Sequence, residues 1–284
     1  MSYQEYRPSS FSILPLAVKN LLIINGILWL ANTVFHEQLG LSVNELFGLY
    51  FPTAEQFAPY QFITHLFLHG NFMHLFSNMF ALWMFGSVLE NYWGPKRFLI
   101  FYFVTGLGAA LIHTGWTWVE LENTRKLFDH YLNAPGLYEF AALIQDNSIP
   151  LTEAFKSQMN GFISEWGASK NDPMMLSKSI EIAASLKEEV LKFKSSIPTV
   201  GASGAVFGVL LAFGMMFPNT LIYVFFAIPI KAKYFVIIYG FFELYSGISN
   251  NPSDNVAHFA HLGGMLFGFL LIKYWKKSDL NRYY

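Results

Sequence analysis

The chain has 284 residues, of which 54% are hydrophobic and only 13% are charged, and its formal net charge is −1. Ordinary soluble domains carry about 25% charged residues, so this chain has too few charges to cover a globule of its size in water. The near-neutral charge argues against a nucleic-acid binder, and the absence of cysteine excludes a disulfide-stabilised secreted domain. We therefore expect a polytopic membrane protein.

Six apolar segments are predicted to form membrane helices, because a spanning helix needs about 20 mostly apolar residues. The fourth segment stops at Pro218 and is too short for a full span, unless one end lies at membrane depth. The apolar stretch 221–230 is interrupted by Pro229 and is predicted to be a loop at the membrane surface. The six segments lie at about 20–35, 72–88, 97–116, 203–218, 234–248 and 256–274.

The basic residues outside a polar segment at 120–196 all fall on one side of this six-span layout. Lysine and arginine are absent between Leu21 and Pro95 and again between Tyr234 and Ile272. The positive-inside rule places the basic side, and both termini, in the cytoplasm. We expect a multi-pass protein of the bacterial plasma membrane. The loops expected outside are 35–71, 249–255 and the polar segment.

The polar segment has the composition of a soluble helical unit. Asp172 and Pro173 supply an N-cap and a first-turn proline for a helix reaching about Lys194. Thr152 is a second candidate cap, for a helix through Ile163. The expected fold is all-α: a six-helix membrane bundle with an extra-cytoplasmic helical insertion between helices 3 and 4. The predicted domains are the first half of the core at 1–118, the insertion at 119–198, and the second half with a cytoplasmic tail at 199–284.

Polar residues inside membrane helices are costly and are functional candidates by default. His74 and Asn78 are four residues apart, so both project from one face of the second helix. Ser203 begins the fourth helix, and the sixth contains His258 and His261. Taken singly, each has a structural explanation: a serine at a helix start is most often a cap or bonded to the backbone, and an interfacial histidine is most often a satisfied polar group.

Stripes of small residues change this balance, because they let membrane helices approach at backbone distance. If two such stripes face each other, Ser203 and His261 come together, and a serine beside a histidine is a nucleophile beside its base. His74, Asn78 and the backbone N–H of Ser203 are candidate donors to the oxyanion that forms when an amide carbonyl is attacked. The stripes are Gly204, Gly208 and Ala212 on the fourth helix and Ala260, Gly264 and Gly268 on the sixth.

No carboxylate is expected beside this pair. Asp254 is assigned to an outer loop, and Glu243 is assigned to the opposite side of the fifth helix. The sequence therefore predicts a Ser-His dyad and not a triad.

These residues resemble the rhomboid family of intramembrane serine proteases over about 16–118 and 199–275. Each motif is weak alone, but the three occur together and in the family's order, on the second, fourth and sixth spans. The motifs are H-x-x-x-N (His74, Asn78), G-x-S-G (Gly201, Ser203, Gly204) and A-H-x-x-G-x-x-x-G (Ala260, His261, Gly264, Gly268).

The resemblance implies a serine endopeptidase that hydrolyses peptide bonds in or near the transmembrane segments of other membrane proteins. Ser203 is then the nucleophile and His261 the general base and acid, while His74, Asn78 and the Ser203 N–H form the oxyanion hole. The expected partners are the lipid bilayer and membrane proteins whose transmembrane helices are easily unwound. Lateral access between spans two and five follows from the same resemblance. Neither a cofactor nor a metal is expected.

Some positions depart from the family's pattern or extend it. Tyr60 and Gln61 stand where many members carry Trp-Arg, so we expect a different anchor for the first outer loop. Phe207 replaces a tyrosine that often stacks on the catalytic histidine, which keeps the stacking and loses the hydroxyl. Glu90 matches a position that stabilises the cytoplasmic end. The insertion is outside the minimal core and its role is open; gating of substrates and contact with a partner are two candidates.

Three alternatives remain open. The first is a catalytically inactive rhomboid-like protein that binds or chaperones membrane clients, which is disfavoured because Ser203 and His261 are both present. The second is a transporter whose broken half-helix binds an anion, but no inverted repeat is detectable. The third is a metal site made by His65, His69 and His74, whose spacing straddles a helix start and lacks a carboxylate.

Overall fold

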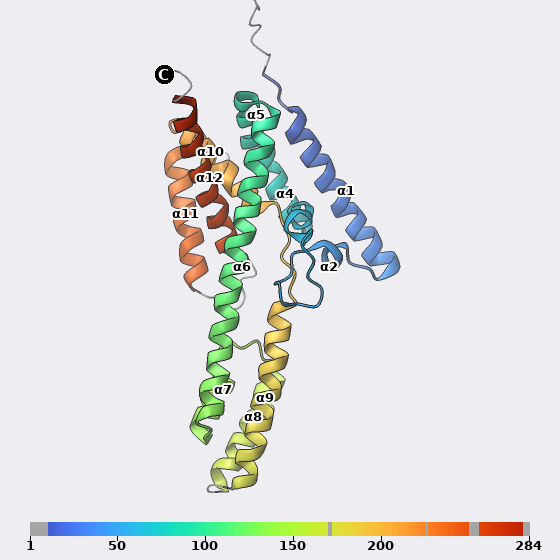
Figure 1. The fold of residues 1–284 in the computed structure, drawn as a ribbon, viewed down its shortest axis with the longest axis vertical. Helices are drawn as coiled ribbons and strands as arrows, with labels where there is room; N and C mark the ends of the chain where they lie inside the picture. The colour runs from blue at the N-terminus through green and yellow to red at the C-terminus, as the bar shows by residue number, and fades with distance from the viewer. Residues whose placement is uncertain (1–10, 170–171, 225–226, 250–255, 281–284) are drawn as a thin grey trace, which may run out of the picture.

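The computed structural model describes residues 11–169, 172–224, 227–249 and 256–280, and this part of the chain is mostly helical (Figure 1). The first half contains α1 (Leu16–Leu39), α2 (Val43–Phe47), α3 (Gln61–Thr64), η1 (His65–Phe67), α4 (Phe72–Ala81), η2 (Leu82–Gly86), α5 (Ser87–Trp93) and α6 (Pro95–Asn133). The second half contains α7 (Leu137–Gln145), α8 (Glu153–Ala168), α9 (Pro173–Ser195), α10 (Ser203–Met216), β1 (Leu221–Val224), β2 (Ile228–Lys231), α11 (Ala232–Ser249) and α12 (His258–Leu280). Residues 250–255 of the predicted outer loop, which include Asp254, lie outside the described residues.

Three helical segments in this part of the chain are long and apolar enough to cross a membrane: Leu16–Leu39, Phe72–Trp93 and Pro95–Asn133. The apolar helix α10 has 14 residues. At 1.5 Å per residue it is about 21 Å long, shorter than the ~30 Å hydrocarbon core. The fourth segment is therefore short, as expected, whereas the total of six spans stays a prediction.

The second predicted span is one rod in which a π-helical turn, η2, joins α4 to α5. Glu90 in its last turn is 3% exposed. The two carboxylate oxygens of Glu90 each accept a 2.8 Å hydrogen bond, from the N–H groups of Ala17 and Val18. The N-cap residue Pro15 forms no side-chain cap, so Glu90 satisfies first-turn amides of α1 that have no intrahelical partner. This links two helices at the end predicted to be cytoplasmic.

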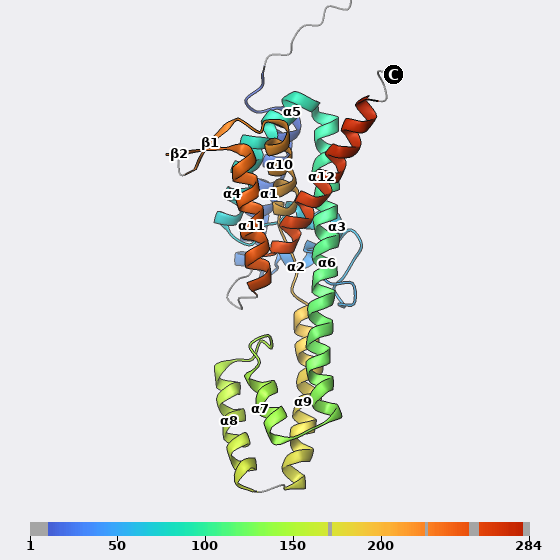
Figure 2. The same cartoon turned by 90° about the vertical axis from the view of Figure 1, so that its left-hand side faces the viewer.

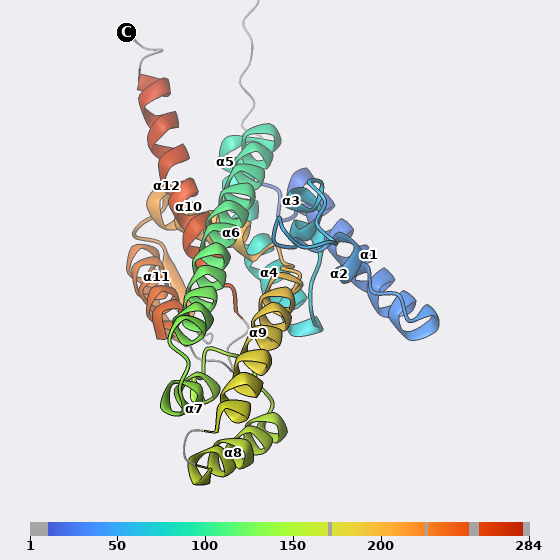
Figure 3. The ribbon, with the colours of Figure 1, turned by 60° about the horizontal axis from the view of Figure 1, so that its bottom comes forward.

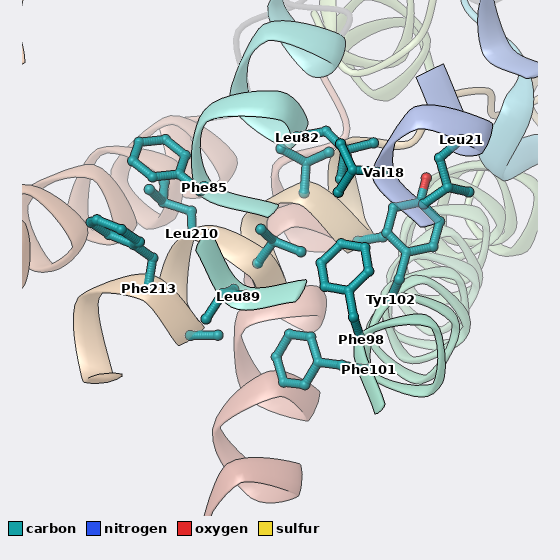
Figure 4. Packing of buried hydrophobic residues seen from close by; sticks show 14 of the residues in the cluster. Val18, Leu21, Leu82, Phe85, Leu89, Phe98, Phe101, Tyr102, Leu210 and Phe213 are labelled. Atoms are coloured by element: carbon teal, nitrogen blue, oxygen red, sulfur yellow. The ribbon is translucent and has the colours of Figure 1, made fainter. Parts of the chain in front are cut away.

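The main hydrophobic core surrounds α10, which packs against α6, α11, α12 and the α4–η2–α5 rod. Figure 4 shows Leu210 and Phe213 of α10 near Phe85 of η2. The rings of Phe85 and Phe213 have centroids 5.0 Å apart. Phe98 and Phe101 of α6 belong to the same core and are fully buried. This packing fixes the helix that begins with Ser203.

A second hydrophobic core lies in the predicted insertion. The helix α6 runs for 39 residues without a break and extends from the first core into the second. Figures 2 and 3 show α6 and α9 side by side, with α7 and α8 next to their far ends. The hydroxyls of Tyr131 in α6 and Ser179 in α9 are 2.6 Å apart. Buried residues of this core include Phe128, Tyr131, Phe140, Ile144, Trp166 and Ala183. The domain boundaries stay a prediction.

Both expected helix caps in the insertion form. The Asp172 carboxylate accepts a 2.9 Å hydrogen bond from the Met174 N–H at the start of α9. The Thr152 hydroxyl accepts one of 3.2 Å from the Phe155 N–H at the start of α8. The second helix continues to Ala168, past its predicted end at Ile163, because the next turn places Trp166 in the insertion core.

The prediction of a loop at 221–230 is wrong. β1 and β2 form an antiparallel pair in which Tyr223 is opposite Pro229. Proline removes one backbone donor, but a strand with a neighbour on one side only tolerates this loss. The two-stranded hairpin directly precedes α11.

Candidate active site

The segment before α10 is held in an extended conformation against the loop between α2 and α3. Thr199 and Leu49 exchange backbone hydrogen bonds of 2.8 and 2.9 Å. Gly201 follows with a φ of 136°, a region that favours glycine. A Cβ atom at this position would lie 2.9 Å from the His74 ring. Glycine therefore lets the chain turn tightly against His74 immediately before Ser203, the first residue of α10.

The small-residue stripes of α10 and α12 face each other, as the sequence indicates. A methyl group on Gly264 would overlap the backbone carbonyl of Gly204, and a methyl group on Gly268 would lie 3.4 Å from the Cα of Gly208. Near the helix starts, a Cβ on Gly204 would lie 3.4 Å from the carbonyl oxygen of Ala260. The first turn of α10, with the candidate nucleophile, therefore lies against the turn of α12 that carries the candidate base.

The His261 side chain is held from two directions. Its ring stacks on Phe207 with a centroid distance of 4.0 Å and an interplanar angle of 5°. Its Nδ1 lies 2.8 Å from Oε2 of Glu243. A carboxylate only accepts hydrogen bonds, so this contact assigns a proton to Nδ1 and leaves Nε2 as the basic nitrogen. Among the described residues, no hydrogen bond joins Ser203 Oγ to the His261 ring.

Glu243 corrects the prediction that no carboxylate stands near this pair. It lies on the face of α11 that meets α12, and the residue is 6% exposed. Its Oε2 is 2.7 Å from His258 Nδ1 as well as 2.8 Å from His261 Nδ1. The assignment of Glu243 to the opposite side of the fifth helix was therefore wrong. The side of α11 that faces α12 depends on packing and cannot be read from residue spacing.

Among the described residues, Glu243, His258 and His261 also form a group whose spacing would suit a metal ion. The candidate ligand atoms of Glu243, His258 and His261 all lie within 4.8 Å of one another. Two histidines and one carboxylate form a common zinc donor set. The N···O distances of 2.7 and 2.8 Å are those of charge-assisted hydrogen bonds, so the protein also satisfies these atoms without an ion.

His74 and Asn78 project from the same face of α4. The Asn78 amide donates a 2.8 Å hydrogen bond to the His74 carbonyl, which leaves its second amide hydrogen for another acceptor. The His74 ring makes an edge contact with His69 at 5.0 Å, and His74 Nδ1 accepts a long 3.5 Å contact from the Gly70 N–H. The other edge of the His74 ring lies against Gly201. His74 therefore borders the turn that precedes Ser203.

Gln61 anchors the loop between α2 and α3, at the position where many members of the resembled family carry arginine. It is 1% exposed. Its amide oxygen accepts hydrogen bonds from the N–H groups of Tyr50, at 3.4 Å, and Ala58, at 3.1 Å, while its amide nitrogen donates to the Gln56 carbonyl at 2.9 Å. The neighbouring Tyr60 ring packs on Phe47. The neutral amide of Gln61 thus holds this loop at the place where an arginine was the expected alternative, which agrees with the prediction of a different anchor.

A cavity of ≈ 720 Å³ lies where the membrane core meets the insertion. Its walls include Thr199, from the extended segment before α10, and Gly247, near the end of α11. From the insertion side it is bordered by Lys194, whose ammonium donates 2.8 Å hydrogen bonds to the Thr124 hydroxyl and the Ser148 carbonyl. Ser203 is not among the lining residues, so this cavity is beside the candidate site and separate from it.

A model of the family described as "Rhomboid domain" matches residues 56–118 and 174–277, which is more than half of the chain. The matched residues include the three motifs of α4, α10 and α12. The stretch that the match skips, 119–173, lies within the predicted insertion, whereas most of α9, which the prediction also assigned to that insertion, is matched.

Sequence relatives give shorter matches. "Rhomboid-like protein 11, chloroplastic" of Arabidopsis thaliana is 36% identical over 88 residues, or 31% of this chain and 30% of that protein. "Rhomboid protease AarA" of Providencia stuartii is 37% identical over 57 residues, 20% of each chain. "RHOMBOID-like protein 5" of Arabidopsis thaliana is 36% identical over 59 residues, 21% of this chain and 19% of that protein. The matches cover less than a third of each relative's length.

Proposed function

Because this chain belongs to the rhomboid family, we propose that it is an intramembrane serine endopeptidase with Ser203 as nucleophile and His261 as general base. The single observation that carries this proposal is the approach of the α10 and α12 backbones at Gly204 and Gly264. It supports the proposal because the first turn of α10, which carries Ser203, packs on the turn of α12 that carries His261, whose Nδ1 is already engaged. A serine beside the free nitrogen of an imidazole would be a nucleophile beside its base.

The proposed reaction is acyl transfer in two stages. Ser203 Oγ attacks the scissile carbonyl carbon while its proton passes to His261 Nε2. When the C–N bond breaks, Nε2 gives this proton to the leaving amine, and an acyl-enzyme remains. Water then attacks the acyl carbon, loses its proton to Nε2 and releases the acid product, with the proton returned to Ser203 Oγ.

The negative charge on the tetrahedral oxygen needs donors fixed in advance. Three groups are candidate donors: the His74 ring, whose edge lies against Gly201, the second amide hydrogen of Asn78, and the backbone N–H of Ser203. The first amides of a helix have no intrahelical acceptor, so the Ser203 N–H is available. We assign the oxyanion hole to these three groups.

The substrates are proposed to be membrane proteins whose transmembrane helices unwind easily, because an amide within a helix is hidden from a nucleophile. Access is assigned to the space between the α4–η2–α5 rod and α11. The outer face of α11 supports a movable wall, since it carries the exposed aromatic side chains Phe241, Phe242 and Tyr245. If a crosslink between the rod and α11 left cleavage intact, this route would be wrong.

The chain is an integral membrane protein, as its apolar helices and family membership indicate. We propose a bacterial plasma membrane with six spans, both termini in the cytoplasm, and the site open to the outside. The insertion then lies outside, where the cavity beside Thr199 and Lys194 offers a place for contact with a substrate or partner.

Cleavage of a single-span substrate in proteoliposomes tests the activity. Ser203→Ala and His261→Ala are each expected to abolish cleavage while the protein stays folded. Ser87→Ala and His130→Ala, which change the same residue types elsewhere, are expected to retain it. Cleavage that survives in Ser203→Ala would contradict the proposal, and absence of cleavage in the wild type with every substrate tried would favour the inactive client-binding alternative.

A further inference from the structure

We propose that Glu243 is a positioning residue for catalysis, which makes the site a Ser203–His261–Glu243 triad in place of a dyad. This inference rests on the proposed protease function and deepens it. It is carried by the 2.8 Å contact between Glu243 Oε2 and His261 Nδ1.

The Glu243 carboxylate is also held by a partner other than His261. Its Oε2 accepts a 2.7 Å hydrogen bond from His258 Nδ1, so two donors converge on one oxygen. Both imidazoles come from α12, one turn apart, whereas Glu243 comes from α11 (Figure 1). The Glu243 side chain is 7% exposed, which limits competition from water. These contacts restrict the carboxylate to the edge of the His261 ring.

The contact has two chemical consequences. It holds the proton of neutral His261 on Nδ1, so that Nε2 presents a lone pair to the serine proton. It also places a negative charge beside the imidazolium that forms once Nε2 is protonated. The proton on Nδ1 stays on the ring throughout, because the carboxylate acts by orientation and charge and not as a proton acceptor.

The Phe207 ring completes the arrangement. It stacks on one face of His261 at 4.0 Å, while Glu243 holds an edge of the same ring. Stacking alone fixes the plane of an imidazole but is equally compatible with a ring flipped by 180° about its Cβ–Cγ bond. The hydrogen bond to Glu243 selects one of the two orientations, and therefore decides which ring nitrogen is left for Ser203.

The chain contains a matched control for the cost of altering a buried carboxylate. Glu90 is 3% exposed and accepts two 2.8 Å backbone hydrogen bonds, but its partners Ala17 and Val18 belong to α1. Glu90→Gln is therefore expected to reduce stability without changing the turnover of folded protein. Glu243→Gln keeps the shape of the side chain and loses the charge on the His261 edge.

The experiment compares wild type, Glu243→Gln and Glu90→Gln for kcat, KM and thermal unfolding on one single-span substrate. General acid–base catalysis contributes about 10²–10⁴-fold. We expect kcat of Glu243→Gln to fall by about 10²-fold or more, with KM little changed, and kcat of Glu90→Gln to stay near the wild-type value. A Glu243→Gln kcat within about tenfold of Glu90→Gln would overturn the proposal, since an orienting carboxylate is worth about 10⁴ in other serine-protease triads.

A second readout does not depend on activity, and it needs a variant only to assign the resonance. In wild-type protein with ¹⁵N-labelled histidine, a strong Nδ1–H···carboxylate bond gives a proton resonance far downfield, and His261→Ala identifies it by its loss. Presence of the His261 resonance supports the Glu243 contact, and its absence overturns it. If wild type neither cleaves substrate nor is labelled by a fluorophosphonate, the protease function fails, while this resonance still decides whether Glu243 holds the ring.

Discussion

Gly264 packs directly on the backbone of Gly204, so closely that a methyl group on Gly264 would overlap the Gly204 carbonyl oxygen. Ser203 and His261 flank this contact in sequence, each within three residues of one of its glycines. The separation of the two backbones therefore sets the separation of the proposed nucleophile and base. Anything that moves α10 away from α12 is expected to affect the chemistry before it unfolds the protein.

Gly264→Ala tests this relationship. Overpacking of a tight contact costs about 1–3 kcal/mol, and a displacement of about 1 Å at a catalytic pair lowers the rate about 10²-fold. We expect cleavage to fall by about that factor, as measured on a reconstituted substrate, with a smaller loss of thermal stability. Gly26→Ala is the control, because a Cβ at Gly26 meets no atom within 4 Å. Equal activities of the two variants would contradict the proposed role of the contact.

Asn78→Ala is expected to lower kcat by about 10²–10³-fold with little change in KM, as loss of one oxyanion donor does elsewhere. The kinetic constants are measured on one substrate at saturating and limiting concentrations. Asn25→Ala provides the matched control: Asn25 is also buried, and its amide donates an equivalent hydrogen bond to Leu21, four residues earlier, at 2.7 Å. If both variants lost the same activity, Asn78 would have only a structural role.

Gln61→Ala is expected to release the loop between α2 and α3. The amides of Tyr50 and Ala58 both donate to the Gln61 side chain, so their hydrogen exchange should accelerate once that acceptor is removed. Mass spectrometry of peptides covering residues 48–60 measures the change. Peptides from α9 serve as the internal reference and should exchange at the wild-type rate. Unchanged protection of the loop peptides would show that Gln61 is not the anchor.

Lys194 predicts a pH dependence of the insertion's stability. Burial lowers the pKa of Lys194 from its ordinary 10.5, and the charges of Glu120 and Asp146 only partly oppose this shift. Between the lowered pKa and 10.5 the unfolded chain binds more protons than the folded chain, so the free energy of unfolding rises with pH in this window.

Lys194→Met removes the titrating group and should flatten that rise, as measured by thermal unfolding in detergent micelles at a series of pH values. The comparison is the slope of stability against pH and not the stability itself, because the variant also loses the hydrogen bonds to Thr124 and Ser148. The same slope in wild type and variant would contradict the attribution of this pH dependence to Lys194.

The membrane segments and the meeting of α10 with α12 are predictable from sequence, because they depend on patterns with a fixed period. Apolar runs mark helices, and glycines four residues apart mark a backbone contact. The position of Glu243 does not follow such a rule: its facing side depends on how α11 packs on α12. One signal was available, since a carboxylate inside an apolar helix without a nearby lysine or arginine is a functional candidate by default.

The loop anchor and the hairpin were harder to infer. Gln61 acts through three hydrogen bonds to residues 50, 56 and 58, and a lone glutamine in a loop carries no periodic signal. In the hairpin, Pro229 suggests an irregular loop, but its position opposite Tyr223 in a two-stranded sheet avoids the usual cost of a missing donor. In both cases tertiary partners decide the structure.

The central claim is that Ser203 is an activated nucleophile, and a fluorophosphonate tests it most directly. The reagent forms a covalent bond with an activated serine hydroxyl, and peptide mass spectrometry locates the adduct. We expect one adduct, on Ser203, in wild type, and none in Ser203→Ala. An unlabelled wild type, or an adduct that persists in Ser203→Ala, would contradict the claim.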